Sequence, residues 1–293
     1  MIVITGSESF VGKELISQCK KKKIEFIGLD GINKKETEYE FHQVDIKSTQ
    51  LVDHIPLNTD TLVHLAAISR DADCKNKAYE CFDTNVMGTL NVIRASLQKK
   101  VKQFIFASTE WVYNEFRPGE EKNEDSLIDI TKHASEYALS KLVTEANLKQ
   151  QYERGFCPAV TILRFGIIYG PRKNNWSAVE SIFSTIKNQD VVTVGSLKNG
   201  RRFIHVSDIA NGIIKSIGLQ GFNIINLTGN KLITMKELIE TSQKVLGKSV
   251  RIIESDPMKA NIRNPSNSKA KRLLNWEPQV DLESGLKTIL PFV

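Results

Sequence analysis

Short apolar runs alternate with helical patterns along the first part of the chain. Five runs have the length and composition of strands: Ile2–Ile4, Ile24–Leu29, Phe41–Ile46, Thr61–Ala67 and Phe104–Phe106. Between them, Lys13–Lys22 and Asn85–Leu97 repeat apolar residues at the three- and four-residue spacing of a helix. Strands that alternate with helices at this interval predict an α/β fold, a Rossmann-like, doubly wound parallel sheet with helices on both faces.

The regular alternation ends after Leu163. Turn-forming residues at Tyr169–Arg172 and Gly195–Gly200 interrupt it, and Phe203–Leu219 then resumes as a strand followed by a helix. We therefore expect the chain to leave the sheet, build a smaller C-terminal substrate-binding lobe and return to the sheet once. The predicted bounds are 1–164 with 203–219 for the first domain, and 165–202 with 220–293 for the lobe.

Two further helical patterns follow in the C-terminal part, over Met235–Leu246 and Ser268–Leu274. A serine or threonine just before a helix can accept a hydrogen bond from its first turn. Thr234 is the candidate cap of the first helix, and Ser266 or Ser268 is the candidate cap of the second.

The first strand ends in a glycine turn. From Gly6 the chain reaches Gly12 through Ser9, Phe10 and Val11, and a helix follows. Such a turn aims backbone N–H groups and the positive end of the helix dipole at one point, which suits a pyrophosphate. Ser9 stands where a glycine would let the pyrophosphate come closest. The turn therefore predicts a dinucleotide site with one departure from the usual spacing.

The second strand ends in Asp30, eighteen residues after Gly12. An acid at this place accepts hydrogen bonds from an adenosine ribose and repels a 2′-phosphate, so it favours NAD over NADP. At the end of the third run, Asp45 is a candidate contact for the adenine amino group, and Ile46 lies beside it. Small residues that would let the backbone pass close to the cofactor follow in Leu65-Ala66-Ala67.

A tyrosine and a lysine stand four residues apart in the helical pattern of residues 134–148. Positions i and i+4 share one helix face, so the Lys141 ammonium is expected beside the Tyr137 phenol. The cation would favour the phenolate and lower a pKa that is ordinarily about 10. Upstream, Ser108 and Thr109 close a strand and offer a hydroxyl to a substrate oxygen. These residues could remove a proton from a carbinol while NAD takes the hydride, or run the reverse.

Composition restricts the function classes only slightly. The chain has 293 residues, with 40 Lys and Arg against 34 Asp and Glu, so the net charge of +6 suits anionic ligands. No aromatic-basic motif accompanies it, and we expect no nucleic-acid partner. No apolar run approaches membrane length and no signal peptide is visible, so we expect no membrane association and a cytoplasmic location. The four cysteines lack metal-binding spacing, which predicts free thiols and no metal.

Several motifs occur in the order found in one enzyme family. They are the glycine turn, His64–Ala67, Asn85–Thr89, Ser108-Thr109, Tyr137–Lys141, Arg164–Arg172, Arg201–Ile209 and Ala270–Trp276. On these motifs, which run along nearly the whole chain, it resembles an extended short-chain dehydrogenase/reductase of the NAD-dependent epimerase/dehydratase family. Members of that family act on nucleotide sugars.

The resemblance implies roles for single residues. Tyr137 would be the catalytic base or acid, Lys141 would hold the nicotinamide ribose, and Thr109 would bind the sugar C4 oxygen. Asn85 falls among the cofactor-binding positions. The implied substrate-binding positions are Arg201 and Arg263, which would contact the diphosphate, and Gly166, where relatives usually have asparagine. Arg202 stands where the family usually has aspartate.

The residues after Thr109 bear on the type of reaction. Dehydratases of the family place an Asp-Glu pair there; Glu110 could serve as the acid, but Trp111 cannot be the base. This counts against a standard 4,6-dehydratase. Simple 4-epimerases usually have small residues at these places, and the acid-aromatic pattern is similar to keto-sugar reductases. Glu110 is thus either catalytic or a surface acid, and Trp111 is a candidate wall of the sugar pocket.

The leading hypothesis is an NAD-dependent epimerase that acts by hydride transfer at C4 of a nucleotide-linked hexose. One alternative is an NAD(P)H-dependent 4-keto nucleotide-sugar reductase. Another, from outside the enzymes, is a non-catalytic NAD-binding scaffold or sensor. The resemblance also implies a homodimer formed through the helices that contain Asn85 and Tyr137, and a role in cell-surface polysaccharide biosynthesis.

Overall fold

The computed structural model describes residues 1–34, 36, 38–173 and 177–293. Contacts divide the chain into two compact units. The first comprises Met1–Asn114, Leu127–Arg164 and Ala210–Ile225; the second comprises Glu115–Ser126, Phe165–Ile209 and Asn226–Val293. Glu115–Ser126 thus belongs to the second unit by its contacts. The functional division, with the cofactor on one domain and the sugar on the other, stays a prediction.

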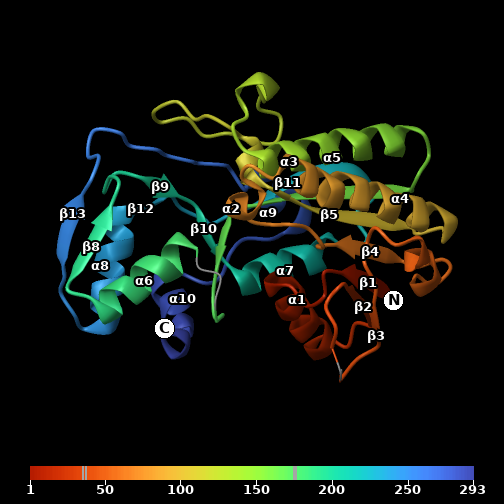
Figure 1. Ribbon diagram of the computed structural model, residues 1–293, viewed down its shortest axis with the longest axis horizontal. Helices are drawn as coiled ribbons and strands as arrows, with labels where there is room; N and C mark the ends of the chain where they lie inside the picture. The colour runs from red at the N-terminus through yellow and green to blue at the C-terminus, as the bar shows by residue number, and fades with distance from the viewer. Residues whose placement is uncertain (35, 37, 174–176) are drawn as a thin grey trace. The chain divides into compact units, whose positions relative to one another are not determined.

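A seven-stranded sheet forms the centre of the first unit (Figure 1). Its strands, in spatial order, are β11 (Gly221–Leu227), β6 (Ala159–Phe165), β5 (Gln103–Thr109), β4 (Thr61–His64), β1 (Ile2–Thr5), β2 (Phe26–Asp30) and β3 (Phe41–Gln43). The pairings from β3 through β5 are parallel. The strand order reverses between β1 and β4, which is where open sheets of this kind bind ligands. The predicted fold class is confirmed.

Helices cover both faces of this sheet, α4 and α5 on one side and α1 and α7 on the other (Figure 1). The main helices are α1 (Phe10–Lys21), α4 (Thr89–Gln98), α5 (Glu136–Glu153) and α7 (Val206–Ser216). A π-helical segment, η2 (Asp83–Gly88), leads into α4. Shorter helices are η1 (Thr49–His54), α2 (Asp71–Cys74), α3 (Ala78–Phe82), η3 (Glu110–Val112) and η4 (Ile130–Lys132). None of the described helices is long and apolar enough to cross a membrane.

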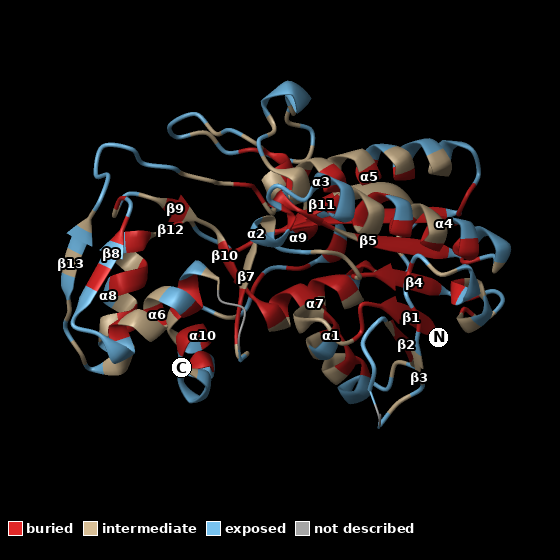
Figure 2. Ribbon diagram, viewed as in Figure 1, coloured by how far each residue is buried: buried red, intermediate tan, exposed pale blue. Residues whose placement is uncertain are grey.

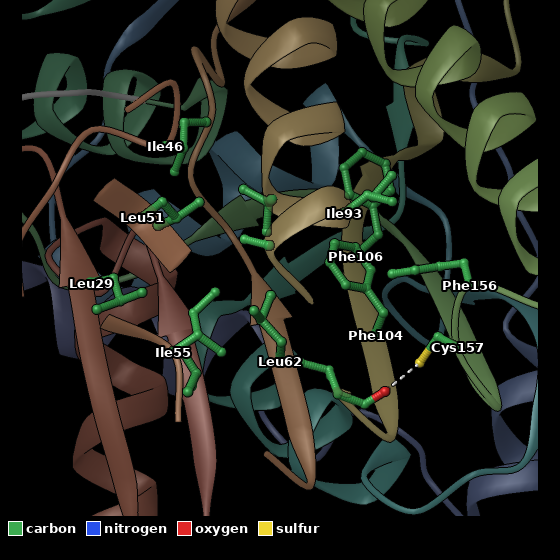
Figure 3. Packing of buried hydrophobic residues seen from close by; sticks show 14 of the residues in the cluster. Leu29, Ile46, Leu51, Ile55, Leu62, Ile93, Phe104, Phe106, Phe156 and Cys157 are labelled. Atoms are coloured by element: carbon green, nitrogen blue, oxygen red, sulfur yellow. Dashed lines mark hydrogen bonds between the residues drawn. The ribbon is translucent and has the colours of Figure 1, made fainter. Parts of the chain in front are cut away.

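The core of the first unit lies between the sheet and its helices. Leu62, Phe104 and Phe106 of the central strands are fully buried against Ile93 of α4 (Figure 3). The Cys157 thiol lies in the same cluster and donates a hydrogen bond to the Val101 carbonyl at 3.1 Å. Figure 2 shows the central strands as buried along their length, which explains why they read as continuous apolar runs in the sequence.

The second unit is built from two-stranded sheets and helices. The strand pairs are β7 (Ile167–Tyr169) with β10 (Phe203–His205), β8 (Val191–Val194) with β13 (Arg251–Glu254), and β9 (Gly200–Arg201) with β12 (Ile233–Thr234). The helices are α6 (Ala178–Asn188), α8 (Met235–Leu246), α9 (Ser268–Leu274), α10 (Leu282–Ile289) and η5 (Leu290–Phe292). Its core joins α6, α8 and α10 through Phe183, Leu238 and Leu286.

The two predicted C-terminal caps have different outcomes. Thr234 caps α8 as predicted, because its side chain accepts a hydrogen bond from the Glu237 N–H at 3.1 Å. The prediction for α9 is wrong. Its N-cap is Asn267, which makes no side-chain cap bond, and the Ser266 hydroxyl accepts instead from the Ser268 N–H at 3.4 Å. The Ser266 oxygen is therefore used within this local turn and does not cap α9.

Candidate active site

The glycine turn, Asp30, Leu65–Ala67 and Ser108-Thr109 lie at the carboxyl ends of β1, β2, β4 and β5, respectively. The Gly6 N–H donates to the Leu29 carbonyl at 2.8 Å, and the Leu65 N–H donates to the Thr5 carbonyl at 3.0 Å. These bonds align the ends of the three strands at one edge. The glycine turn, Asp30 and the Leu65–Ala67 stretch therefore lie together, as the strand pattern predicts.

The glycine turn is closed so tightly that two of its positions require glycine. Gly6 has φ +71°, and a Cβ added there would lie 2.6 Å from the Ala66 nitrogen. A Cβ on Gly12 would lie 2.3 Å from the Gly6 carbonyl oxygen. Gly6 thus packs against the residues after β4, and the start of α1 packs against Gly6, a tight turn of the kind that binds a pyrophosphate.

Ser9 has a local role that sequence reasoning missed. It is the N-cap of α1, with φ −66°, and its hydroxyl accepts a hydrogen bond from the Gly12 N–H at 3.0 Å. This backbone conformation is open to any residue, so the φ angle at this position does not require glycine. Ser9 stabilises the start of the helix whose positive end faces the predicted pyrophosphate site.

The two acids that were predicted to hold the adenosine half differ in their surroundings. Asp30 accepts hydrogen bonds from the Glu8 N–H at 2.9 Å and the Ile32 N–H at 3.1 Å. Asp45 is exposed and accepts from the Lys47 N–H at 2.8 Å within its own turn. Asp30 is thus fixed beside the glycine turn, and each of its oxygens retains a lone pair for a ribose hydroxyl. The adenine contact of Asp45 and Ile46 stays a prediction.

Asn85 is buried and its amide is engaged by the protein on both sides. Its oxygen accepts from the Ile68 N–H at 2.8 Å, and its nitrogen donates to the Ile68 carbonyl and to the Ser140 hydroxyl, each at 3.0 Å. Asn85 thereby ties the loop after β4 to helix α5. The cofactor-binding role of Asn85 stays a prediction.

Lys141 of α5 is buried, with 3% of its surface exposed. Its ammonium donates to the Ala107 carbonyl at 2.8 Å and lies 4.7 Å from the centre of the Phe106 ring. Burial lowers the pKa of Lys141 to about 8. Helix α5 therefore brings the Lys141 ammonium to the carboxyl end of β5, and its expected place beside the Tyr137 phenol stays a prediction.

The pKa of Tyr137 differs from the expectation. Desolvation raises the pKa of Tyr137 to about 12, against a hydrogen bond with Thr109 that lowers it. The lowered pKa expected for this phenol is thus not found in the protein by itself. Because a phenolate is costly in this environment, further positive charge at the site is needed to favour it.

The end of β5 presents the two hydroxyls differently. Thr109 is buried, caps η3 by accepting from the Trp111 N–H at 3.2 Å, and is the hydrogen-bond partner of Tyr137. Ser108 donates instead to Glu145 Oε1 at 2.5 Å. The geometry therefore favours Thr109 for contact with a substrate oxygen, and the contact expected for Ser108 stays a prediction.

Glu110 and Trp111 follow Thr109 in η3. Glu110 is 1% exposed, so it is not the surface acid that the sequence left open, whereas Trp111 is partly exposed. A catalytic role of Glu110 and a place of Trp111 in the sugar pocket stay predictions. Among the described residues, no group of three or more His, Cys, Asp or Glu is arranged to hold a metal ion.

A buried ion pair beneath the site escaped the sequence analysis. Arg164 donates to both oxygens of Glu145, at 3.0 and 2.6 Å, and both side chains are 4% exposed. Arg164 also donates to the Tyr113 hydroxyl at 2.9 Å. The sequence feature that could have indicated this ion pair is Glu145, which stands four residues after Lys141 and so shares its helix face.

In the second unit, the two arginines assigned to the diphosphate lie on adjacent segments. Arg201 donates to the carbonyls of Gly200 and Asn261 at 2.7 and 2.6 Å, and the Arg263 N–H donates to the Gly200 carbonyl at 3.0 Å. Both side chains are partly exposed. The structure thus brings Arg201 and Arg263 together within this unit, and their contact with a diphosphate stays a prediction.

Arg202 and Gly166 are the two departures from the family pattern in this unit. Arg202 donates to Glu121 at 2.7 Å and to the Asn264 side chain at 2.6 Å, so it serves as a tie between chain segments. A Cβ on Gly166 would lie 3.1 Å from the Arg202 carbonyl oxygen and 3.3 Å from Thr228. An asparagine at position 166 would therefore force its neighbours to shift.

Comparison with known proteins agrees with the motifs. The profile described as "NAD dependent epimerase/dehydratase family" matches residues 2–227. A UDP-glucuronate 4-epimerase of Thermodesulfobacterium geofontis is 28% identical over 97% of this chain and 93% of that protein. A UDP-glucuronic acid decarboxylase of Arabidopsis thaliana is 31% identical over 97% of this chain and 68% of that protein.

A solved structure extends the likeness to the fold. The UDP-glucose 4-epimerase of Thermotoga maritima, crystallised with UDP-glucose, superimposes with a TM-score of 0.87 at 22% identity, over 99% of this chain and 97% of that one. The glycine turn and Asp30 lie at the ends of β1 and β2, where this fold binds dinucleotides. The roles of Tyr137, Lys141 and Thr109 stay predictions. The chain therefore belongs to the NAD-dependent epimerase/dehydratase family and is an NAD-dependent enzyme of the extended short-chain dehydrogenase/reductase type.

Proposed function

We propose that the enzyme is a 4-epimerase that acts on a UDP-linked hexose or hexuronate. The observation that carries the proposal is the grouping of Tyr137, Lys141 and Thr109 at the end of β5. The relatives named above, a UDP-glucuronate 4-epimerase among them, support the nucleotide and the position of the reaction on the sugar. Trp111, in place of a base, argues against a standard 4,6-dehydratase.

The roles of the three residues follow from their contacts. Thr109, as the hydrogen-bond partner of Tyr137, orients the C4 oxygen toward the phenol, and Tyr137 takes and returns the C4 hydroxyl proton. Lys141 holds its positive charge near the phenol and favours the phenolate. When bound, NAD supplies the acceptor for the C4 hydride, the donor that returns it, and a further positive charge that favours the phenolate.

A 4-keto-sugar reductase is the second candidate, because the buried Glu110 follows Thr109 and an aromatic residue follows it. The test incubates the purified full-length protein with UDP-glucuronate or UDP-glucose without added cofactor and identifies the products by proton NMR. A C4 epimer supports the proposal, and a UDP-pentose would identify a decarboxylase. Activity only with NADH and a 4-keto sugar would identify a reductase. No turnover together with bound NAD would favour the non-catalytic scaffold.

We further propose that Arg201 and Arg263 bind the substrate diphosphate. Both are partly exposed cations on adjacent segments of the second unit. Replacing each with methionine should raise KM with a smaller effect on kcat, because diphosphate binding is shared by ground and transition states. A change in kcat alone would contradict this assignment.

We also propose a cytoplasmic homodimer. All four cysteines are buried free thiols, as suits a reducing compartment. On the outer side of α5, a groove of about 660 Å³ is lined by apolar residues that include Leu142, Val143 and Phe222. Such a groove suits a second copy of the chain. Light scattering should give twice the monomer mass, and Leu142→Glu should return it to the monomer mass; a monomeric native protein would refute the proposal.

A further inference from the structure

The turn between β1 and α1 contains a largely buried acid, Glu8. The side chain of Glu8 is 9% exposed. Its Oε1 accepts hydrogen bonds from the Lys34 ammonium at 2.8 Å and from the Tyr39 hydroxyl at 2.6 Å. The ammonium of Lys13 lies 3.7 Å from Oε2. The carboxylate is thus surrounded by two cations and a phenol, all from the first unit.

The backbone of Glu8 places this cluster beside the acid that faces the adenosine ribose. The Glu8 N–H donates to Asp30 Oδ2 at 2.9 Å. The residue whose carboxylate binds Lys34 is therefore joined through its backbone to Asp30, at the end of β2.

Lys34 stands four residues after Asp30, on the loop where this fold places the cation for a 2′-phosphate when NADP is the cofactor. Here the ammonium is bonded to Glu8 and lies 5.3 Å from the centre of the Tyr39 ring. Burial works to raise the pKa of Glu8, but the bonds from Lys34 and Tyr39 and the nearby positive charges outweigh it and lower this pKa below its usual value. The acid is therefore ionised at neutral pH and holds the lysine.

Tyr39 fixes the geometry of this pair. Its ring packs so closely on β2 that a Cβ on Gly28 would lie 2.5 Å from its Cε2 atom. Burial, followed by the hydrogen bond to Glu8, raises the pKa of Tyr39 to about 12, so the phenol keeps its proton and donates it to Glu8. The loop cation is thereby tied back to the glycine turn.

We propose that Glu8 is a cofactor-specificity residue, which excludes dinucleotides with a 2′-phosphate by binding the Lys34 ammonium. The family's dependence on NAD does not assign this role, which rests on the contacts of this chain's own turn and loop. It concerns only the cofactor and holds whichever sugar reaction the enzyme catalyses.

The test compares the affinity of the nucleotide-free full-length protein for NAD⁺ and for NADP⁺ by titration calorimetry. Glu8→Gln keeps the side-chain shape and its acceptor for Tyr39 but removes the charge. We expect its affinity for NADP⁺ to rise about tenfold, because the 2′-phosphate carries roughly two negative charges, while its affinity for NAD⁺ changes little. Glu14→Gln is the matched control; Glu14 accepts from Gln18 at 2.8 Å, and its loss should leave the ratio unchanged.

The same substitution in a Lys34→Met background separates the released lysine from a general charge effect. Most of the gain in NADP⁺ affinity should vanish there, because no lysine at position 34 is then released. An unchanged NADP⁺ affinity in Glu8→Gln, an equal gain with and without Lys34, or an equal gain in Glu14→Gln would each overturn the proposal. Loss of NAD⁺ binding in Glu8→Gln would also overturn it, since Glu8 would then support the turn itself.

Discussion

Two buried cations of the first unit, Lys141 and Arg164, have opposite surroundings. Arg164 is bound through two of its nitrogens to Glu145, and the Tyr113 ring lies 4.9 Å from its guanidinium carbon. Lys141 has a carbonyl and an aromatic ring, and no carboxylate ion pair with it is found in residues 1–34, 36, 38–173 and 177–293. Both residues bury a positive charge, which costs free energy, but only Arg164 has a carboxylate partner among the described residues.

The pKa values follow this difference. Burial works to lower the pKa of Arg164, but the charge of Glu145 outweighs it, so the arginine stays charged throughout the accessible pH range. Burial also lowers the pKa of Lys141, to about 8, because the nearby Cys81, Cys74 and Glu145 only partly offset it. Paired charge gives a rigid support, and a buried charge without an ion-pair partner gives a group that can respond to a substrate.

The largest effect is expected from Tyr137→Phe, which removes the proposed proton carrier on the helix that also bears Lys141. Turnover should fall about a thousandfold, because proton transfer at the C4 oxygen loses its side chain. Binding of NAD⁺ and the midpoint of thermal unfolding should change little, since the ring remains in place. Steady-state kinetics, titration calorimetry and a melting curve measure the three quantities. Retention of native turnover would remove Tyr137 from the mechanism.

Breaking the ion pair of Glu145 and Arg164 should lower the free energy of unfolding more than it lowers turnover. Glu145→Gln leaves the buried Arg164 charge without its counter-ion, so the free energy of unfolding should fall by about 3–5 kcal/mol in urea titrations. Replacing both partners with apolar residues, as in Glu145→Leu with Arg164→Met, should cost less than the single change. A single variant as stable as the native protein would show that the pair is not a support.

The unpaired lysine should give stability a dependence on pH. Its pKa is lowered from 10.5 in the unfolded chain to about 8 in the fold, so between these values the unfolded chain binds more protons. Stability should therefore rise by about 3 kcal/mol as pH increases from 8 to 10.5, with the cost of the buried charge fully present below pH 8. Lys141→Met should lack this rise. Urea titrations at pH 8 and pH 10.5 give the unfolding free energy of both proteins. An equal rise with pH in the native protein and in Lys141→Met would contradict the lowered pKa.

The sequence was sufficient for the sheet and for which residues meet at its edge. Buried parallel strands leave continuous apolar runs, and short motifs at their ends place Gly6, Asp30 and Thr109 at one edge whatever the loops do. The i and i+4 spacing of Tyr137 and Lys141 needed only a helix. These features depend on local pattern, which a sequence displays directly.

The energetics of the site depended on contacts between distant segments, which no local pattern displays. The raised pKa of Tyr137 comes from burial, and the ion pair of Glu145 needs an arginine nineteen residues further along the chain. Ser9 was compared with a missing glycine, although its hydroxyl caps α1. The α9 cap was missed because the Ser266 hydroxyl bonds within its own turn. Each case depends on the surroundings of a polar side chain, which the local sequence pattern does not give.

The smallest effect is expected from Ser108→Ala. This change tests whether Ser108 belongs to the ion pair of Glu145 and Arg164 or to the candidate active site. Ser108 stands beside Thr109 in sequence, yet its hydroxyl belongs to the ion pair through its 2.5 Å bond to Glu145. Losing one donor to a carboxylate that keeps its arginine should cost about 1 kcal/mol of unfolding free energy. KM and kcat should stay near their native values. A raised KM with unchanged stability would instead restore Ser108 as a substrate contact, as its place in the sequence first indicated.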